Sequence, residues 1–266
     1  METASEGVGQ EYMKISVVSV SYNAASEIEP TLRSVARQSW QDTEYLVIDG
    51  GSSDGTLGIV ERYRDHVDVL VSEPDGGIYD AMNKALRLAT GDAVIFMNAG
   101  DYFHSPYVVE LAAEFMDANP EAGVVYGGIE VRYPDGRVSE FMPPDETQAM
   151  DFLICGSLPH QGTFARRTAF ARTGLFDTRW RSHADYDWFL KAASDPRIGM
   201  KRMDLMVASF GLGGASSQLE RGERERHAIQ NALPLYRQRE WMERRIEAYQ
   251  EQYIGLRLEN ERLTAV

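Results

Sequence analysis

Cysteine is almost absent from this 266-residue sequence, because Cys155 is its only one. No disulfide can therefore form within the chain, which favours a reducing compartment, and we expect a cytoplasmic protein. Residues 1–13 contain neither a basic stretch nor an apolar run of the kind that directs secretion, and we interpret them as a disordered leader. No apolar run approaches roughly 18 residues, the length that a membrane-spanning helix needs. We therefore expect at most peripheral contact with a membrane.

Positive charge is also scarce: 27 Lys and Arg residues stand against 41 Asp and Glu residues, and the formal net charge is -14. Long-range electrostatics then give the protein no general attraction for phosphate polyanions, so we expect no nucleic-acid partner. An excess of carboxylates suits a divalent cation instead. A hydrophobic content of 43% is ordinary for a globular protein, and we expect a packed core.

Four short apolar segments predict parallel strands that are covered on both faces. They are residues 15–20 (ISVVSV), 45–48 (YLVI), 67–71 (VDVLV) and 93–97 (AVIFM). The segments between them have helical signals, from Pro30 onward, over residues 56–64 and over residues 81–89. This alternation predicts an α/β fold with a doubly wound, mostly parallel sheet and right-handed crossovers.

The chain changes character after the fourth predicted strand. Ser105 and Pro106 are favoured at the start of a helix, and Asp135-Gly136 between two β-rich segments predicts a hairpin. Because no long Gly/Ser linker interrupts the sequence, we expect residues 14–104 and 105–218 to form two halves of one domain, the second with a mixed sheet.

A helical tail is predicted over residues 219–266, where Arg, Glu and Gln are frequent. Apolar residues and one Asn recur there at steps of four and three, as in a heptad seam: Met242, Ile246, Tyr249, Tyr253, Leu256, Asn260 and Leu263. The same pattern fits an amphipathic helix that folds back on its own domain. A single Asn in the seam favours two strands, and we predict a homodimer through this helix.

Two acids stand at the ends of predicted strands. Asp49 ends the second strand, and Asp101 closely follows the fourth. The carboxyl ends of the strands form the ligand-binding crevice of an open α/β sheet, which makes Asp101 our first candidate metal ligand.

Several motifs occur in the order that is typical of one enzyme family. They are ISVVSVSYN, LVIDGGSSDGT, SEPDGGIYDAMNKALRLATGDAVIFMNAGD, LPHQGTF, SHADYDWFLKAA and GLGGASS. Over residues 14–217 the chain thereby resembles the family two glycosyltransferases, inverting enzymes of GT-A type that take a sugar from a nucleoside diphosphate. The resemblance implies that residues 14–104 bind the nucleotide sugar and that residues 105–218 form the acceptor side.

The resemblance also implies roles near the nucleotide base. Tyr22 packs on or beside the base, and Ser21 and Asn23 fix the nearby backbone. Asp49 accepts a hydrogen bond from a pyrimidine N–H, and we expect UDP rather than GDP or dTDP. The alternatives are a core position for the aromatic ring and turn chemistry for the segment after Asp49.

Asp75, Asp80, Asn83 and Lys84 lie in a glycine-containing turn and the helix that follows it. By resemblance, Asp75 or Asp80 contacts hydroxyls of the donor sugar, Asn83 lies near the donor, and Lys84 pairs with phosphate or with Asp80. The alternative is a turn that starts a helix and carries a solvated ion pair.

Residues 98–101 stand where the family carries its Asp-x-Asp signature. Asn98 and Gly100 replace acids that are common there, so Asp101 alone keeps the charge, with Asn98 and Gly100 beside the donor. Mn²⁺ or Mg²⁺ needs few protein carboxylates when phosphate oxygens and water complete its coordination. Asp101 is then sufficient as the protein ligand.

The last motifs imply the catalytic groups. The resemblance places His160 near the acceptor and the departing diphosphate, and a buried structural histidine is the alternative. The first acid of a motif such as SHADYDW is the general base in the family, which assigns that role to Asp185, with Asp187 as a capping carboxylate. Residues 211–217 (GLGGASS) resemble a flexible segment over the donor, or form a plain loop.

Together these features predict a metal-dependent inverting glycosyltransferase that acts on a saccharide or lipid-linked saccharide, at the inner face of the cytoplasmic membrane. Two alternatives stay open. One is a degenerate enzyme that serves as an assembly subunit through its tail. The other is a sugar nucleotidyltransferase, although SVSYNAAS has neither the Gly nor the Lys that a triphosphate-binding loop uses.

Overall fold

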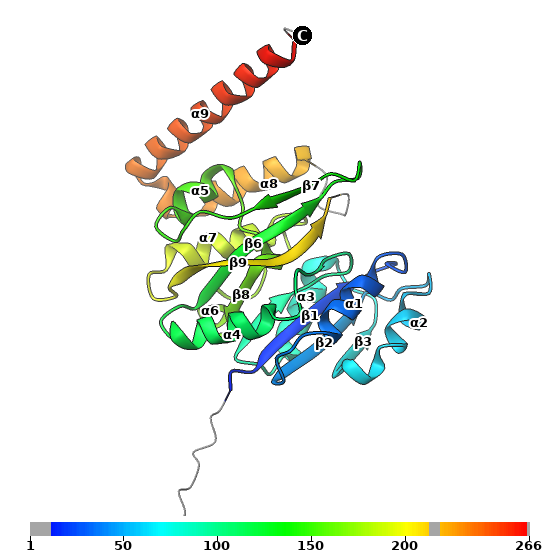
Figure 1. Ribbon diagram of the computed structural model, residues 1–266. Coiled ribbons are helices and arrows are strands. Elements are labelled where there is room, and N and C mark those ends of the chain that lie inside the picture. The colour runs from blue at the N-terminus through cyan, green and yellow to red at the C-terminus, as the bar shows by residue number, and fades with distance from the viewer. Residues whose placement is uncertain (1–11, 213–218, 265–266) are drawn as a thin grey trace, which may run out of the picture.

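A mixed sheet of nine strands runs through the computed structural model, which describes residues 12–212 and 219–264 (Figure 1). Its first part is parallel, in the order β3 (Val69–Ser72), β2 (Thr43–Asp49), β1 (Ile15–Ser21) and β4 (Ala93–Phe96). All seven residues of β1 are buried, as expected for an apolar strand with both faces covered. The register pairs Ser21 with Asp49 and Asp49 with Ser72, so the carboxyl ends of three strands are aligned.

Helices cover both faces of this parallel part, which confirms the predicted doubly wound arrangement. They are α1 (Ile28–Ala36), α2 (Thr56–Glu61) with the short 3-10 turn η1 (Arg64–His66), and α3 (Ile78–Leu88). Met82 of α3 belongs to the core on one face of the sheet, and Leu32 of α1 belongs to the core on the other. The strands alternate their side chains between these two cores.

The second half extends the same sheet in mixed orientation, as predicted. From β4 the order continues through β8 (Thr163–Arg166), β6 (Val124–Arg132), β9 (Met200–Gly211) and β5 (Tyr102–Phe103), with β7 (Val138–Phe141) paired to β6. The β6–β7 hairpin turns at Asp135-Gly136, where Gly136 has the positive φ of 85° that such a turn needs. Since β8 bonds directly to β4, one continuous sheet joins both halves.

The helices of the second half are α4 (Val108–Ala118), α5 (Ala149–Cys155), α6 (Arg167–Thr173) and α7 (Ala184–Ser194), with the 3-10 turn η2 (His160–Gly162) before β8. The start predicted for α4 at Ser105-Pro106 is wrong, because the helix begins at Val108. Gln38 explains the shift. Its side-chain oxygen accepts a hydrogen bond from the Val109 N–H, and its amide donates to the Ser105 carbonyl. A side chain from the segment after α1 thus caps α4 in place of Ser105.

The predicted helical tail is confirmed at the C-terminal end, whereas the N-terminal boundary differs from the prediction. Met13, assigned to the leader, is buried, and its carbonyl accepts a hydrogen bond from the Trp40 indole, so the packed domain includes it. The tail consists of α8 (Leu219–Ala232), the 3-10 turn η4 (Leu235–Arg237) and α9 (Arg239–Thr264). Ile229 and Tyr236 are buried in the domain, and the Tyr249 hydroxyl bonds to the carbonyl of Ile154 at 3.2 Å. The tail is therefore attached to the domain over its first half.

Beyond this attachment, α9 projects away from the domain (Figure 1), and residues 251–262 are all exposed. Four seam residues are about half exposed or more, namely Met242, Ile246, Tyr253 and Leu256. Tyr249, the seam residue between them, packs on the domain instead. The exposed seam positions fit a helix that pairs with a second copy, whereas Tyr249 fits a helix that folds back on its own domain. Within the described ranges, no helix is both long and apolar enough to cross a membrane.

Candidate active site

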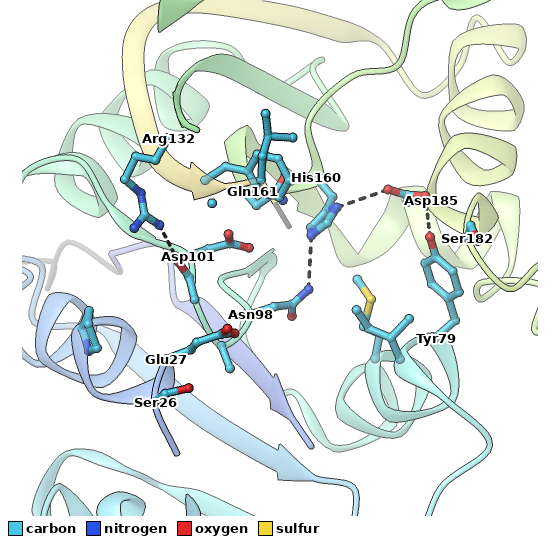
Figure 2. Close-up of a pocket in the computed structure, with 18 of the residues that line it drawn as sticks. Ser26, Glu27, Tyr79, Asn98, Asp101, Arg132, His160, Gln161, Ser182 and Asp185 are labelled. Atoms are coloured by element: carbon cyan, nitrogen blue, oxygen red, sulfur yellow. Dashed lines mark hydrogen bonds and ion pairs between the residues drawn. The ribbon is translucent and has the colours of Figure 1, made fainter. Parts of the chain in front are cut away.

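A cleft of about 580 Å³ opens between the two halves of the sheet, beyond the carboxyl end of β4 (Figure 2). The residues after β4 form its floor, α1 and α3 contribute their first turns, and η2 and α7 line the opposite side. The polar residues that face it are Ser26, Glu27, Asn98, Asp101, Arg132, His160, Gln161, Arg181, Ser182 and Asp185. Four predicted site residues, Asn98, Gly100, Asp101 and His160, therefore meet the predicted catalytic Asp185 in one cavity.

Asp185 lies in the first turn of α7, where its carboxylate is held by three groups. The Tyr79 hydroxyl donates to Oδ1 at 2.7 Å, the backbone N–H of Tyr186 donates to the same oxygen at 2.9 Å, and His160 Nδ1 lies 3.2 Å from Oδ2. Burial by itself raises the pKa of Asp185, but the bonds from His160 and Tyr79 outweigh it, and the pKa lies below its usual value. The group is thus an ionised, oriented carboxylate at neutral pH.

His160 connects the two sides of the cleft. Burial lowers the pKa of its imidazole, but the hydrogen bond to Asp185 and the charges of Asp185 and Asp101 outweigh burial and raise it. On the other side, Nε2 lies 3.2 Å from Asn98 Nδ2, while Asn98 Oδ1 is buried without a partner. Rotating the Asn98 amide by half a turn would let Oδ1 accept a hydrogen bond from a protonated ring. Both amide orientations are compatible with a His160 that donates to Asp185.

Asp101 follows β4 and is almost fully buried, with 6% of its surface exposed. Burial raises the pKa of its carboxyl to about 7, although the charges of His160 and Arg132 and a hydrogen bond with Gln161 oppose this. Arg132 donates from Nη2 to the Gly100 carbonyl at 2.6 Å, which fixes the loop that carries Asp101. Figure 2 shows Asp101 and Asp185 on the two sides of His160.

The surroundings of Asp101 fit a hard divalent cation. Oxygen ligands suit Mn²⁺ and Mg²⁺, and Asn98, which lines the same cleft as Asp101, has a side-chain oxygen without a partner. A cation would also offset the cost of burying the Asp101 carboxylate. No group of three or more His, Cys, Asp or Glu side chains forms a complete metal cage within the described part of the chain. The cation would therefore depend on phosphate oxygens and water for the rest of its coordination.

The predicted base-binding residues form a separate cluster at the ends of β1 and β2. Tyr22 is 67% exposed and so accessible to a planar ring. The Asn23 side chain instead accepts a hydrogen bond from the Ser53 N–H. Asp49 is fully buried and accepts hydrogen bonds from the hydroxyls of Ser21, Ser52 and Ser72 and from two backbone N–H groups. A nucleobase that bonds to Asp49 must therefore replace one of these donors.

The position after Asp49, where a second acid is common in the family, is occupied by Gly50 and has little room for a side chain. A Cβ atom at this position would lie 2.7 Å from Asp75 Oδ2 and 3.2 Å from the Tyr22 ring. Asp75 and Tyr22 thus close around the glycine, and Asp75 occupies the space beside the predicted base site. Asp75 and Asp80 also accept hydrogen bonds from the N–H groups of Gly77 and Gly76, as expected for a turn that starts a helix.

Asn83 and Lys84 do not reach the cleft. Asn83 is buried, where its amide donates to the Phe176 carbonyl at 2.8 Å and accepts from the Phe176 N–H at 2.9 Å. Lys84 pairs with Glu73 at 2.7 Å and not with Asp80. The structure assigns Asn83 to packing between α3 and the chain before α7, because a buried loop must satisfy its backbone groups.

We expect Asn83→Ala to destabilise the protein by about 2–3 kcal/mol, since it leaves both polar groups of Phe176 buried without partners. The folded variant should bind nucleotide with unchanged affinity. Urea denaturation and nucleotide titration measure the two effects. Loss of nucleotide binding at unchanged stability would instead place Asn83 at the donor.

Several residues of the cleft were not predicted as site residues, among them Tyr79, Arg132 and Glu27. Tyr79 lies inside the GGIYDAMNK motif, and its position one helical turn before Asn83 gave no sign that its hydroxyl reaches α7. Arg132 and Glu27 lie outside all the motifs. Only the pairing of β6 with β9 and the approach of α1 bring them to Asp101, so no local pattern could have found them.

Comparison with known proteins agrees with this geometry. The sequence profile of Glycosyl transferase family 2 matches residues 16–174. A PGL/p-HBAD biosynthesis glycosyltransferase of Mycobacterium tuberculosis is 30% identical over 208 residues, which cover 77% of this chain and 79% of that protein. These matches set aside the sugar nucleotidyltransferase.

Solved structures share the fold at lower identity. Staphylococcus aureus TarS 1-349 in complex with UDP-GlcNAc superposes with a TM-score of 0.64 and 22% identity, over 84% of this chain and 68% of that one. This chain covers 39% of the longer TarS structure. A mannosyltransferase from Pyrobaculum calidifontis in complex with GDP-Man and Mn²⁺ gives a TM-score of 0.60 and 20% identity, over 82% and 62% of the two chains. The resemblance and the GT-A fold predicted from the sequence are confirmed, and the chain belongs to glycosyltransferase family 2.

Proposed function

We propose that this glycosyltransferase is a metal-dependent inverting enzyme in which Asp185 is the general base. The observation that supports it best is the arrangement of the cleft. An ionised carboxylate at the start of α7 and a second, buried carboxylate at the end of β4 face one cavity from opposite halves of the sheet. One is suited to accept a proton from the acceptor hydroxyl, and the other to hold the diphosphate side.

In the proposed reaction, the acceptor hydroxyl attacks the anomeric carbon from the face opposite the diphosphate. The C–O bond to the diphosphate breaks as the new glycosidic bond forms, and Asp185 takes the hydroxyl proton. Tyr79 and His160 keep the carboxylate in one orientation through their hydrogen bonds. An α-linked donor would then give a β-linked product.

Asp101 is the protein ligand that would hold Mn²⁺ or Mg²⁺, with Asn98 beside it. When bound, such a cation neutralises charge on the leaving diphosphate. Arg132 supports this side of the cleft, because its bond to the Gly100 carbonyl fixes the loop before Asp101. The raised pKa of Asp101 is consistent with a group that gains a cation when the donor binds.

We assign a nucleoside diphosphate sugar as the donor and favour UDP as its nucleotide. Tyr22 is exposed for stacking on a base, and Asp49 would accept a pyrimidine N–H in place of one of its present hydrogen-bond donors. TarS is solved with UDP-GlcNAc, whereas the mannosyltransferase is solved with GDP-Man. A thermal-shift panel of UDP-, GDP- and dTDP-sugars with Mn²⁺ tests this choice. Stabilisation by GDP-sugars alone would contradict it.

For the acceptor we assign a saccharide or a lipid-linked saccharide, used at the inner face of the cytoplasmic membrane through peripheral contact. The name of the mycobacterial relative assigns it to PGL/p-HBAD biosynthesis, and that of TarS to a poly(ribitol-phosphate) substrate. Release of nucleotide from the donor in the presence of metal and acceptor separates this enzyme from an inactive assembly subunit.

The exposed half of α9 supports a homodimer. Tyr253 and Leu256 are exposed on the part of α9 that extends away from its own domain (Figure 1). Met242 and Ile246, about half exposed in the preceding turns, belong to the same apolar seam, and a second copy would bury it. A helix of this length is marginal in water unless it is packed.

Ending the chain after Gln250 should therefore convert dimer to monomer while the domain stays folded, because Tyr236 and Tyr249 remain in place. Light scattering measures the change, and nucleotide binding should be unaffected. A full-length protein that is monomeric at micromolar concentration would contradict the dimer.

A further inference from the structure

A second groove, of about 590 Å³, adjoins the active-site cleft, and we name it the α1 groove. Its basic residues are Arg33 on α1, Arg37 at the C-terminal cap of that helix, Arg132 on β6 and His104 after β5. Asp and Glu are absent from the described residues that line it. In a chain with a formal net charge of -14, a groove with three arginines and no carboxylate is an unusual local excess of positive charge.

The two arginines at the end of α1 have no partner of their own. Arg33 in the last turn of α1 and Arg37, the residue that caps its C-terminal end, are both exposed, and neither forms an ion pair or side-chain hydrogen bond with any described residue. Like charges four positions apart repel each other. Exposed arginines elsewhere do find acids, as Arg62 does with Glu29. The fold thus leaves the positive charges of this groove available to a ligand.

The groove is continuous with the cleft. Pro30 and Arg132 line both, so a ligand in the cleft can extend past Arg132 into the groove. Arg132 is fixed there: its guanidinium stacks over the Tyr102 ring at 4.3 Å and donates to the Gly100 carbonyl, and its buried Nε has no partner. From Pro30, α1 leads away from the cleft. Arg33 lies about one turn beyond Pro30, and Arg37, at the C-terminal cap, lies roughly 6 Å beyond Arg33 along the helix axis.

We propose that the α1 groove binds phosphate groups of the acceptor, so that the acceptor carries a phosphate or phosphodiester close to the hydroxyl that receives the sugar. This inference rests on the proposed function and narrows its acceptor class. Guanidinium groups bind phosphate oxygens in a bidentate manner, and their spacing along α1 suits successive phosphates. The donor phosphates do not account for the groove, because Asn98 and Asp101, which the proposed reaction places beside the diphosphate, do not line it.

The test uses fructose bisphosphate as a probe, with fructose as the uncharged control. Full-length protein with saturating UDP and Mn²⁺ is titrated calorimetrically. The wild type should bind the bisphosphate but not fructose, and Arg33→Gln/Arg37→Gln should bind it at least about tenfold more weakly. A matched variant, Arg87→Gln/Arg257→Gln, loses the same charge at exposed sites outside the groove and should bind like the wild type.

Equal bisphosphate binding by the wild type and the α1 variant would overturn the proposal, as would an equal loss in the matched variant. Co-sedimentation with phosphatidylglycerol vesicles gives the second arm. If the α1 variant loses vesicle binding but keeps bisphosphate binding, the groove contacts a membrane surface and not the acceptor. A wild type that binds no nucleotide contradicts the proposed donor function, whereas the bisphosphate comparison without nucleotide still tests the groove.

Discussion

The Asp185→Asn variant should transfer sugar at least about 100-fold more slowly than the wild type while it binds the donor nucleotide normally. The substitution keeps the shape of the side chain but removes the basic oxygen that takes the acceptor proton. Asp185 is ionised before the reaction, because His160 and Tyr79 keep its pKa below the usual value, so the wild type has the base in its active form at neutral pH. Initial rates and a nucleotide titration measure the two properties.

Asp187 provides the matched control. It lies in the same first turn of α7 but pairs with Lys191 at 2.6 Å and does not line the cleft. Asp187→Asn should therefore retain most of the transfer activity. Wild-type turnover by Asp185→Asn would remove Asp185 from the mechanism, and an equal loss in both variants would indicate a structural effect on α7.

The parallel part of the sheet could be predicted because its signals are local. Each strand is a short apolar run, and parallel strands must bring their carboxyl ends to one edge, so the position of Asp101 at that edge followed from the sequence. The meeting of Asp101 with Asp185 did not follow. It depends on the antiparallel pairing of β8 with β4, which brings His160 across the sheet and fixes α7 opposite Asp101.

The structural role of Asn83 could not be predicted from its position in the sequence. Its spacing from Asp80 suggested that both face the donor, but a polar side chain is equally suited to satisfy a buried backbone segment, as Asn83 does for Phe176. Only tertiary contacts distinguish the two cases. Tyr249 is comparable, since its place in the heptad seam does not reveal that its hydroxyl bonds to the domain.

Asp101→Asn should abolish the dependence of nucleotide binding on added Mn²⁺ or Mg²⁺. The wild type should bind UDP at least about tenfold more tightly with metal than with a chelator, because the cation links the carboxylate to the phosphates. Without the Asp101 charge the cation loses its only carboxylate ligand at the end of β4, and both conditions should give the weak affinity. Calorimetric titrations with Mn²⁺ and with chelator compare the two proteins.

Asp92 is the control for this substitution because it lies at the opposite end of the same strand. It is exposed, and its carboxylate accepts a hydrogen bond from the Lys14 N–H, far from the cleft along β4. Asp92→Asn should keep the full metal dependence. If wild-type protein binds UDP equally well with and without chelator, Asp101 has no metal role. The charges of His160 and Arg132 and the hydrogen bond to Gln161 would then have to offset the cost of burying the Asp101 carboxylate.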